Sequence, residues 1–112
     1  MTSVRLIETS PGSFSLLLDA GTNQVDELVE QRGHEPNGYF WEGVARFLVT
    51  TEAPSLQDRV SYDPEGSMFC AYGTDRPALE ELGTLLTDLA TTPTRMDALI
   101  TAAKAADFDF DD

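Results

Sequence analysis

Cysteine and histidine are nearly absent from this sequence, which has one residue of each among its 112. The single cysteine, Cys70, cannot form an internal disulfide, and this is compatible with a reducing compartment. One histidine and one cysteine cannot by themselves supply the ligands of a typical zinc site. We therefore expect no disulfide, no metal site and no cofactor.

Basic side chains are also scarce, because 20 acidic residues stand against seven basic ones and give a net charge of −13. Such a surface repels nucleic acid and anionic membranes, and it attracts basic partners from a distance. The sequence also lacks a glycine-rich phosphate loop and a basic patch interleaved with aromatic residues. We therefore expect no nucleic-acid partner and no membrane partner. A simpler explanation of the charge stays open, since acidity alone keeps many small proteins soluble.

Long apolar runs are missing as well. No segment approaches the roughly 20 apolar residues that span a bilayer, and the first residues lack the apolar region of a secretion signal. Apolar residues nevertheless make up 41% of the sequence, which is enough for a core. A length of 112 residues fits one domain. We expect a single domain with a cytoplasmic location.

The first half of the chain has the pattern of a hairpin followed by a helix. Two short apolar runs, Val4–Glu8 and Phe14–Leu18, flank turn-forming residues at 10–13. Helical spacing of apolar residues begins after Asn23, a residue type that often caps helices, and Gly33 is placed to end this helix. This half therefore predicts two strands and a first helix.

The second half repeats this order without sequence similarity to the first. Apolar runs at 59–62 and 67–72 flank residues 63–66, where the places of proline and glycine fit a type I turn. Two amphipathic helices follow, with Asp75 and Thr92 as predicted N-caps and a proline close behind each. Together with a second helix in the first half, the order is ββααββαα. We predict an α+β fold in which both hairpins join one antiparallel sheet, covered by two pairs of helices.

The chain ends in an acidic tail, and we predict the α+β domain at 1–106 and the tail at 107–112. Its alternating aspartates match the start of a calcium loop, but the glycine and the glutamate that complete such a loop are missing. Phe108 and Phe110 alternate with the acids. Three states fit this pattern: an edge strand, an acidic arm that lays two rings on a basic partner, and a frayed terminus, which we expect.

The segment at 33–45, GHEPNGYFWEGVA, contains the single histidine, the single tryptophan and three consecutive aromatic residues between two glycines. Pro36 prevents a continuous helix from the preceding segment, so we expect a new helix with Asn37 as its N-cap. Successive helical residues point about 100° apart, so three adjacent rings cover most of the circumference. Trp41 lies off the apolar stripe of this helix. It is therefore either buried against a second layer or exposed as an anchor for a partner.

This segment resembles a signature of the Imm51 family of bacterial immunity proteins. The resemblance continues through residues 59–73 and the helical region after them. That family belongs to polymorphic toxin systems, so the resemblance implies a non-enzymatic protein that binds and silences a cognate toxin in the producing cell. Many toxins of such systems act on nucleic acids and are basic. An acidic immunity protein would then associate faster because of the charge difference.

We expect contacts with such a toxin around the aromatic segment, on the second hairpin and in the tail. The candidates are His34, Glu35, Trp41, Glu42, Tyr62, Asp107, Phe108, Asp109 and Phe110. Two other functions stay open. A general acidic interaction or adaptor domain would have the same sequence features, and a small hydrolase or transferase would use His34 and Cys70. The enzyme is disfavoured, because Cys70 lies among apolar neighbours and in no recognisable nucleophile motif.

Overall fold

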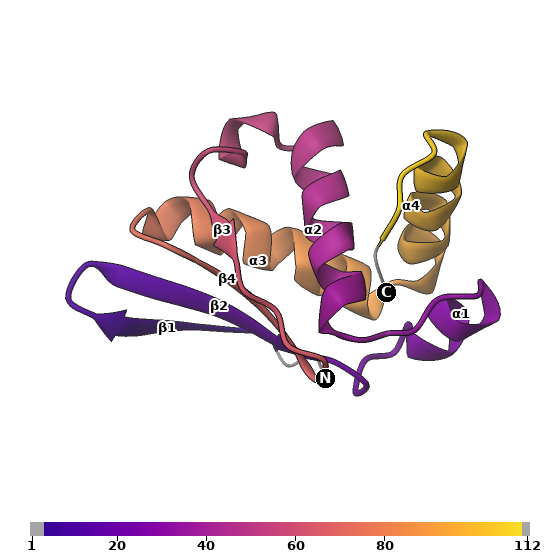
Figure 1. The fold of residues 1–112 in the computed structure, drawn as a ribbon, viewed down its shortest axis with the longest axis horizontal. Coiled ribbons are helices and arrows are strands. Elements are labelled where there is room, and N and C mark those ends of the chain that lie inside the picture. Colours follow the sequence, from indigo (N-terminus) through magenta and orange to yellow (C-terminus); the bar gives the residue numbers. More distant parts are fainter. Residues whose placement is uncertain (1–3, 111–112) are drawn as a thin grey trace.

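A computed structural model describes residues 4–110 of the chain, and Figure 1 shows its ribbon. The described residues form four strands, four α-helices and one short 3-10 helix, η1. In chain order they are β1 (Arg5–Ser10), β2 (Ser13–Asp19), α1 (Asp26–Gln31), α2 (Gly38–Thr51), η1 (Pro54–Leu56), β3 (Ser61–Tyr62), β4 (Met68–Gly73), α3 (Arg76–Thr91) and α4 (Pro93–Ala105). The predicted α+β class is confirmed. The observed order differs from the predicted ββααββαα by η1, a short 3-10 helix between α2 and β3.

One antiparallel sheet contains the four strands of this region in the order β1-β2-β4-β3. The two hairpins therefore join through β2 and β4. Leu16, Leu18, Phe69 and Ala71 point to one face of the sheet, the inner face, and are at most 2% exposed. Helices α2 and α3 pack on this face, and α4 and α1 extend the helical layer beyond it (Figure 1). The core lies between this layer and the sheet.

The two hairpins differ in how well the sequence located their turns. The first turn contains Gly12, whose φ of 80° is a left-handed conformation that glycine adopts without strain. This turn lies where it was predicted. The predicted turn at residues 63–66 is wrong, because Glu65 and Met68 exchange backbone hydrogen bonds of 2.8 and 3.3 Å. The tight turn therefore lies between these two residues, and the chain before it continues alongside β4.

Side chains cap two of the helices at the residues that the sequence predicted. Asn37 and Asp75 each accept a hydrogen bond from the backbone N–H three residues further on, at 2.8 and 3.1 Å. Asn23 is not a cap, because α1 begins only at Asp26. The Asn23 side chain instead donates a 2.9 Å hydrogen bond to the backbone carbonyl of Asp19, at the end of β2. This bond ties the linker before α1 to the sheet.

Two glycines allow the backbone of other segments to cross α2 at close range. A side chain at Gly38 would collide with the backbone carbonyl groups of Glu65 and Met68 in the second hairpin. A Cβ atom at Gly43 would lie 2.8 Å from the Cα and O atoms of Phe110 in the tail. The two glycines that flank the aromatic run are therefore contact points for the hairpin and for the tail.

The C-terminal tail folds back onto α2 as far as Phe110. Asp107 has a φ of 57° and reverses the chain after α4. Phe110 is 2% exposed, and Phe108 is half-buried. The expected frayed terminus is therefore wrong for residues 107–110, because burial of two aromatic rings outweighs the entropy of the short segment that carries them. The last two residues of the predicted tail lie outside the described residues.

Candidate partner-binding surfaces

Trp41 is fully buried, so it does not act as an exposed anchor. Its exposed fraction is 0%, and its ring meets Phe40 edge to face at a centroid distance of 6.0 Å. Helix α2 packs against β4 and also against α3, and this leaves few open sides. Of the two alternatives for Trp41, burial against a second layer is the one that the structure shows. Its indole N–H has no hydrogen-bond acceptor among the described residues.

His34 belongs to a cluster of aromatic rings that fixes the tail. Its ring centroid lies 5.5 Å from that of Phe40 and 5.0 Å from that of Phe110, and these two phenylalanines are 5.0 Å apart. Phe108 extends the cluster, with its centroid 5.4 Å from Phe110 and 5.2 Å from Phe47. Three predicted contact residues, His34, Phe108 and Phe110, are therefore brought together, and they serve first to hold the tail against α2.

The structure does not bring His34 and Cys70 together as a catalytic pair. His34 packs against α2, on the inner side of the sheet, whereas Cys70 alternates with buried Phe69 and Ala71 and points to the opposite face. Burial raises the pKa of the Cys70 thiol, a hydrogen bond with Ser15 lowers it in part, and the negative charges of Asp63 and Glu65 raise it. A raised pKa keeps the thiol neutral near pH 7, which disfavours a nucleophilic role.

A recess of about 500 Å³ lies between α4, the end of α1 and the tail. Its lining includes Arg32, His34, Lys104, Phe108 and Phe110. Arg32 is also paired with Asp97 at 2.6 Å. The positive charge of Arg32 is therefore already paired, and Lys104 is the remaining cationic side chain of the lining.

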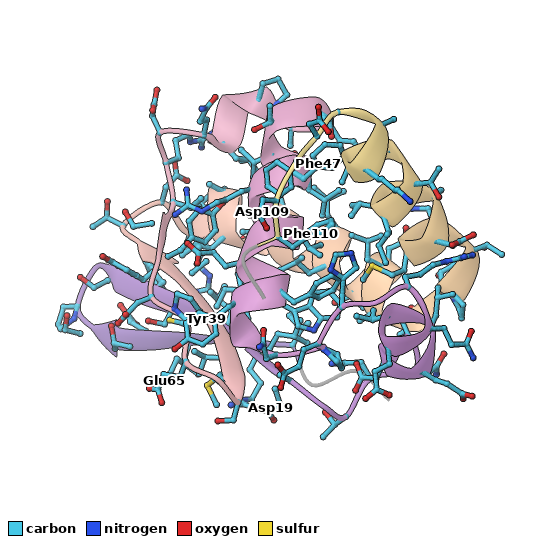
Figure 2. The ribbon with its side chains drawn as sticks, turned by 45° about the vertical axis from the view of Figure 1, so that its right-hand side comes forward. Asp19, Tyr39, Phe47, Glu65, Asp109 and Phe110 are labelled. Carbon is cyan, nitrogen blue, oxygen red and sulfur yellow. The ribbon has the colours of Figure 1, made fainter. Side chains whose placement is uncertain are left out.

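One exposed surface lies along α2 and will be called the helix face; it consists of Tyr39, Glu42, Arg46 and Tyr62. Residues 39, 42 and 46 follow helical spacing, so they share one side of α2. Glu42 and Arg46 form a 2.6 Å ion pair, and the Arg46 guanidinium lies 4.7 Å from the centre of the Tyr62 ring. Burial raises the pKa of Tyr62, the positive charge of Arg46 lowers it, and Glu42 raises it. In Figure 2 Tyr39 lies at the front, toward Glu65.

The second exposed surface is the side of the sheet turned away from the helices, the outer face. It includes Arg5, Ile7, Ser15, Leu17, Asp19, Met68, Cys70 and Tyr72, and Arg5 is paired with Asp19 at 3.0 Å. Ile7 is 43% exposed and Tyr72 is 45% exposed. Sequence reasoning missed this face and also missed Tyr39, which is 44% exposed. The alternation Met68, Cys70, Tyr72 was the available signal, because alternate strand residues point to one face.

Acidic groups dominate the charge of the surface. Each of the six arginines has a carboxylate within 4 Å. Their partners are Asp19, Asp97, Glu42, Asp75, Glu80, Glu52 and Asp88. Exposed pairs of this kind contribute little to stability, about 0–1 kcal/mol each. Their effect here is to neutralise most of the positive charge locally, so the field beyond the surface comes from the remaining carboxylates.

Comparison with known proteins identifies the family. A model of the family described as Immunity protein 51 matches residues 4–105 of the chain. The chain belongs to this family. No curated protein and no solved structure matches it. The family match includes both hairpins, all four helices of the described region and both glycines that are crossed by other segments. Within residues 4–110, no helix has the length and apolar character that crossing a membrane requires.

Proposed function

We propose that this chain is an immunity protein that binds a cognate bacterial toxin in the cytoplasm of the producing cell and neutralises it by occlusion. The observation that carries the proposal is membership of the Immunity protein 51 family over residues 4–105. The mechanism requires tight binding and no catalysis. The separation of His34 from Cys70 on opposite sides of the sheet supports a binding role over an enzymatic one.

The charge of the chain supports a basic partner. A net charge of −13 attracts a basic toxin domain and accelerates association, and the effect falls with salt because the Debye length is about 10 Å at 0.1 M ionic strength. Among the predicted contact residues, Glu35, Asp107 and Asp109 are exposed, and Glu42 and Tyr62 are half-buried. We assign these residues to the approach of the toxin. The buried Trp41 stabilises the fold instead.

Co-expression tests this function. The chain is produced in a test bacterium together with the product of the gene immediately upstream of its own, and growth is scored. The proposal requires that this product stops growth alone and is harmless in the presence of the chain. A product that is lethal with and without the chain would contradict the proposal for that pair.

Association kinetics then test the role of the charge. With a purified toxin and chain, the double charge reversal Glu35→Lys and Glu42→Lys should lower the association rate at low salt and leave the dissociation rate nearly unchanged. The same measurement at high salt is the control, because screening should remove the difference. An association rate that is equal at low salt would remove these two acids from the steering surface.

A further inference from the structure

The outer face offers apolar surface that no described element covers. Ile7 pairs with Ser15 across β1 and β2, and Ser15 pairs with Tyr72 across β2 and β4, so these three residues form one row. Arg5, Leu17 and Cys70 form the neighbouring row, in which the charge of Arg5 is paired with Asp19 at 3.0 Å. Directly opposed residues of antiparallel strands are about 5 Å apart. Ile7 and Tyr72 therefore lie about 10 Å apart with a small side chain between them, and this leaves a depression between two exposed apolar groups.

A hollow of about 450 Å³ deepens this depression beside Tyr72. The residues that line it are Thr9, Ser13, Phe14, Ser15, Asp63, Cys70, Tyr72, Gly73 and Thr74. None of the described residues that line it is basic. The backbone N–H of Asp63 donates a 2.9 Å hydrogen bond to the carbonyl of Cys70, which places the Asp63 carboxylate beside this part of the sheet.

The charge of this surface selects between possible occupants. A second copy of the chain would bring another net charge of −13 against Asp63 and Glu65, and like charges at close range oppose such a contact. A basic protein gains from the same groups. An aromatic ring beside a carboxylate fits the side chain of arginine or lysine, because the cation can lie over the ring while it pairs with the acid.

We propose that the toxin seats on the outer face, with one of its arginine or lysine side chains in the hollow between Tyr72 and Asp63. This inference rests on the proposed immunity function and names the surface that performs it. Tyr72 and Ile7 then supply the apolar anchors that bury against the toxin and slow dissociation. The acids elsewhere on the chain act earlier, during approach.

Two exposed tyrosines provide a matched test on the purified complex of the chain with the toxin encoded upstream. Tyr72 is 45% exposed on the outer face and Tyr39 is 44% exposed on the helix face, so their replacement by alanine removes similar surface. Tyr72→Ala should raise the dissociation rate about tenfold or more, as expected at a binding hot spot. Tyr39→Ala should leave the dissociation rate within about threefold of the wild type, as expected away from a hot spot. The reverse result would overturn the proposal and place the toxin on the helix face.

Two charge reversals separate local contact from general attraction. Asp63→Lys and Glu81→Lys change the net charge equally, but Asp63 lines the hollow and Glu81 is exposed on α3 in the helical layer. Both variants should slow association similarly. Only Asp63→Lys should also raise the dissociation rate, by about tenfold. Equal dissociation rates for the two variants would contradict a salt bridge in the hollow.

The single cysteine gives a test that needs no substitution. Cys70 lies on the outer face, so bound toxin should shield it from alkylation by iodoacetamide. Intact-mass measurement of the chain, free and in complex, should show a modification rate at least about tenfold lower in the complex, which is what burial in a well-packed interface implies. An unchanged rate in a complex that still forms would overturn the proposed seat. A chain that neither binds the toxin nor protects the cell would remove the immunity function, and this inference with it.

Discussion

Substitution of Gly43 by alanine should have opposite effects with and without the end of the tail. In the middle of a helix, alanine is about 1 kcal/mol more favourable than glycine. In this chain the new Cβ atom would lie 2.8 Å from the Cα and O atoms of Phe110, which are backbone atoms that cannot rotate away. The tail must then move, and Phe110 must leave the site where it is 2% exposed.

The gain from the helix propensity of alanine can be compared with the loss from exposing the Phe110 side chain. Loss of a buried phenylalanine side chain costs about 1.5–3 kcal/mol, so the full-length Gly43→Ala chain should be less stable than the wild type by about 0.5–2 kcal/mol. A chain that ends at Asp109 lacks the atoms that the new methyl group would meet. In that shortened chain the same substitution should stabilise the fold by about 1 kcal/mol.

Urea unfolding of the four chains measures this double-mutant cycle. Trp41 is the only tryptophan and is fully buried, so its fluorescence reports the unfolding of the core. The coupling between Gly43 and the tail should be about 1.5–3 kcal/mol. If alanine at position 43 changes the free energy of unfolding equally in both backgrounds, the tail does not cross α2 at this glycine and the reasoning fails.

Substitutions at two further positions, Trp41 and Asp75, test other features of the structure. Trp41→Ala should lower the free energy of unfolding by about 3–5 kcal/mol, as expected for a buried aromatic residue. Trp41→Phe should lower it much less, because this substitution also removes an N–H group that lacks an acceptor among the described residues. Both variants lack the tryptophan fluorophore, so circular dichroism follows their unfolding. The guanidinium of Arg59, 2.5 Å from Asp75, and the amide of Ala78 hold the pKa of Asp75 below its usual value. A folded-state pKa below the unfolded-state value contributes stability that is complete above the unfolded-state pKa and is lost as the pH falls through the folded-state pKa. Asp75→Asn keeps a capping oxygen, so it should destabilise the chain at pH 7, and this deficit should shrink as the pH falls below about 4. A deficit that does not shrink as the pH falls would show that the charge of Asp75 is not its cause.

The sequence predicted the parts of the fold that depend on local chemistry. Alternating apolar residues located the strands, and Asn37 and Asp75 capped their helices as expected, because a side-chain oxygen three residues before a free N–H needs no tertiary context. Asn23 failed as a cap because a tertiary bond to the carbonyl of Asp19 competes for its side chain. The turn of the second hairpin also failed, since the register is set by pairing with β4 and not by the proline and glycine alone.

The candidate contacts were less predictable than the fold, for a different reason. Trp41 and Phe110 were predicted as toxin contacts because they are aromatic residues beside polar ones. Both are buried, because α2 packs against the sheet on one side and against the tail on another. Tyr39 and Tyr72 are exposed, although each lies in an apolar run. Whether a face of a strand or helix is exposed depends on how many layers of secondary structure the domain has. The pattern of a single sequence does not determine the number of layers.

The aromatic segment, on which the resemblance to the family was first seen, belongs to the scaffold of the domain. In the aromatic segment, Gly38 and Gly43 admit other backbones, Asn37 caps α2, and Trp41 fills the core. Each of these roles is internal to the chain, so a toxin need not touch any of them. If the toxin binds on the outer face as proposed, the specificity for one toxin depends on strand residues whose side chains do not pack in the core. Substitutions there, unlike those in the aromatic segment, should change the partner without changing the fold.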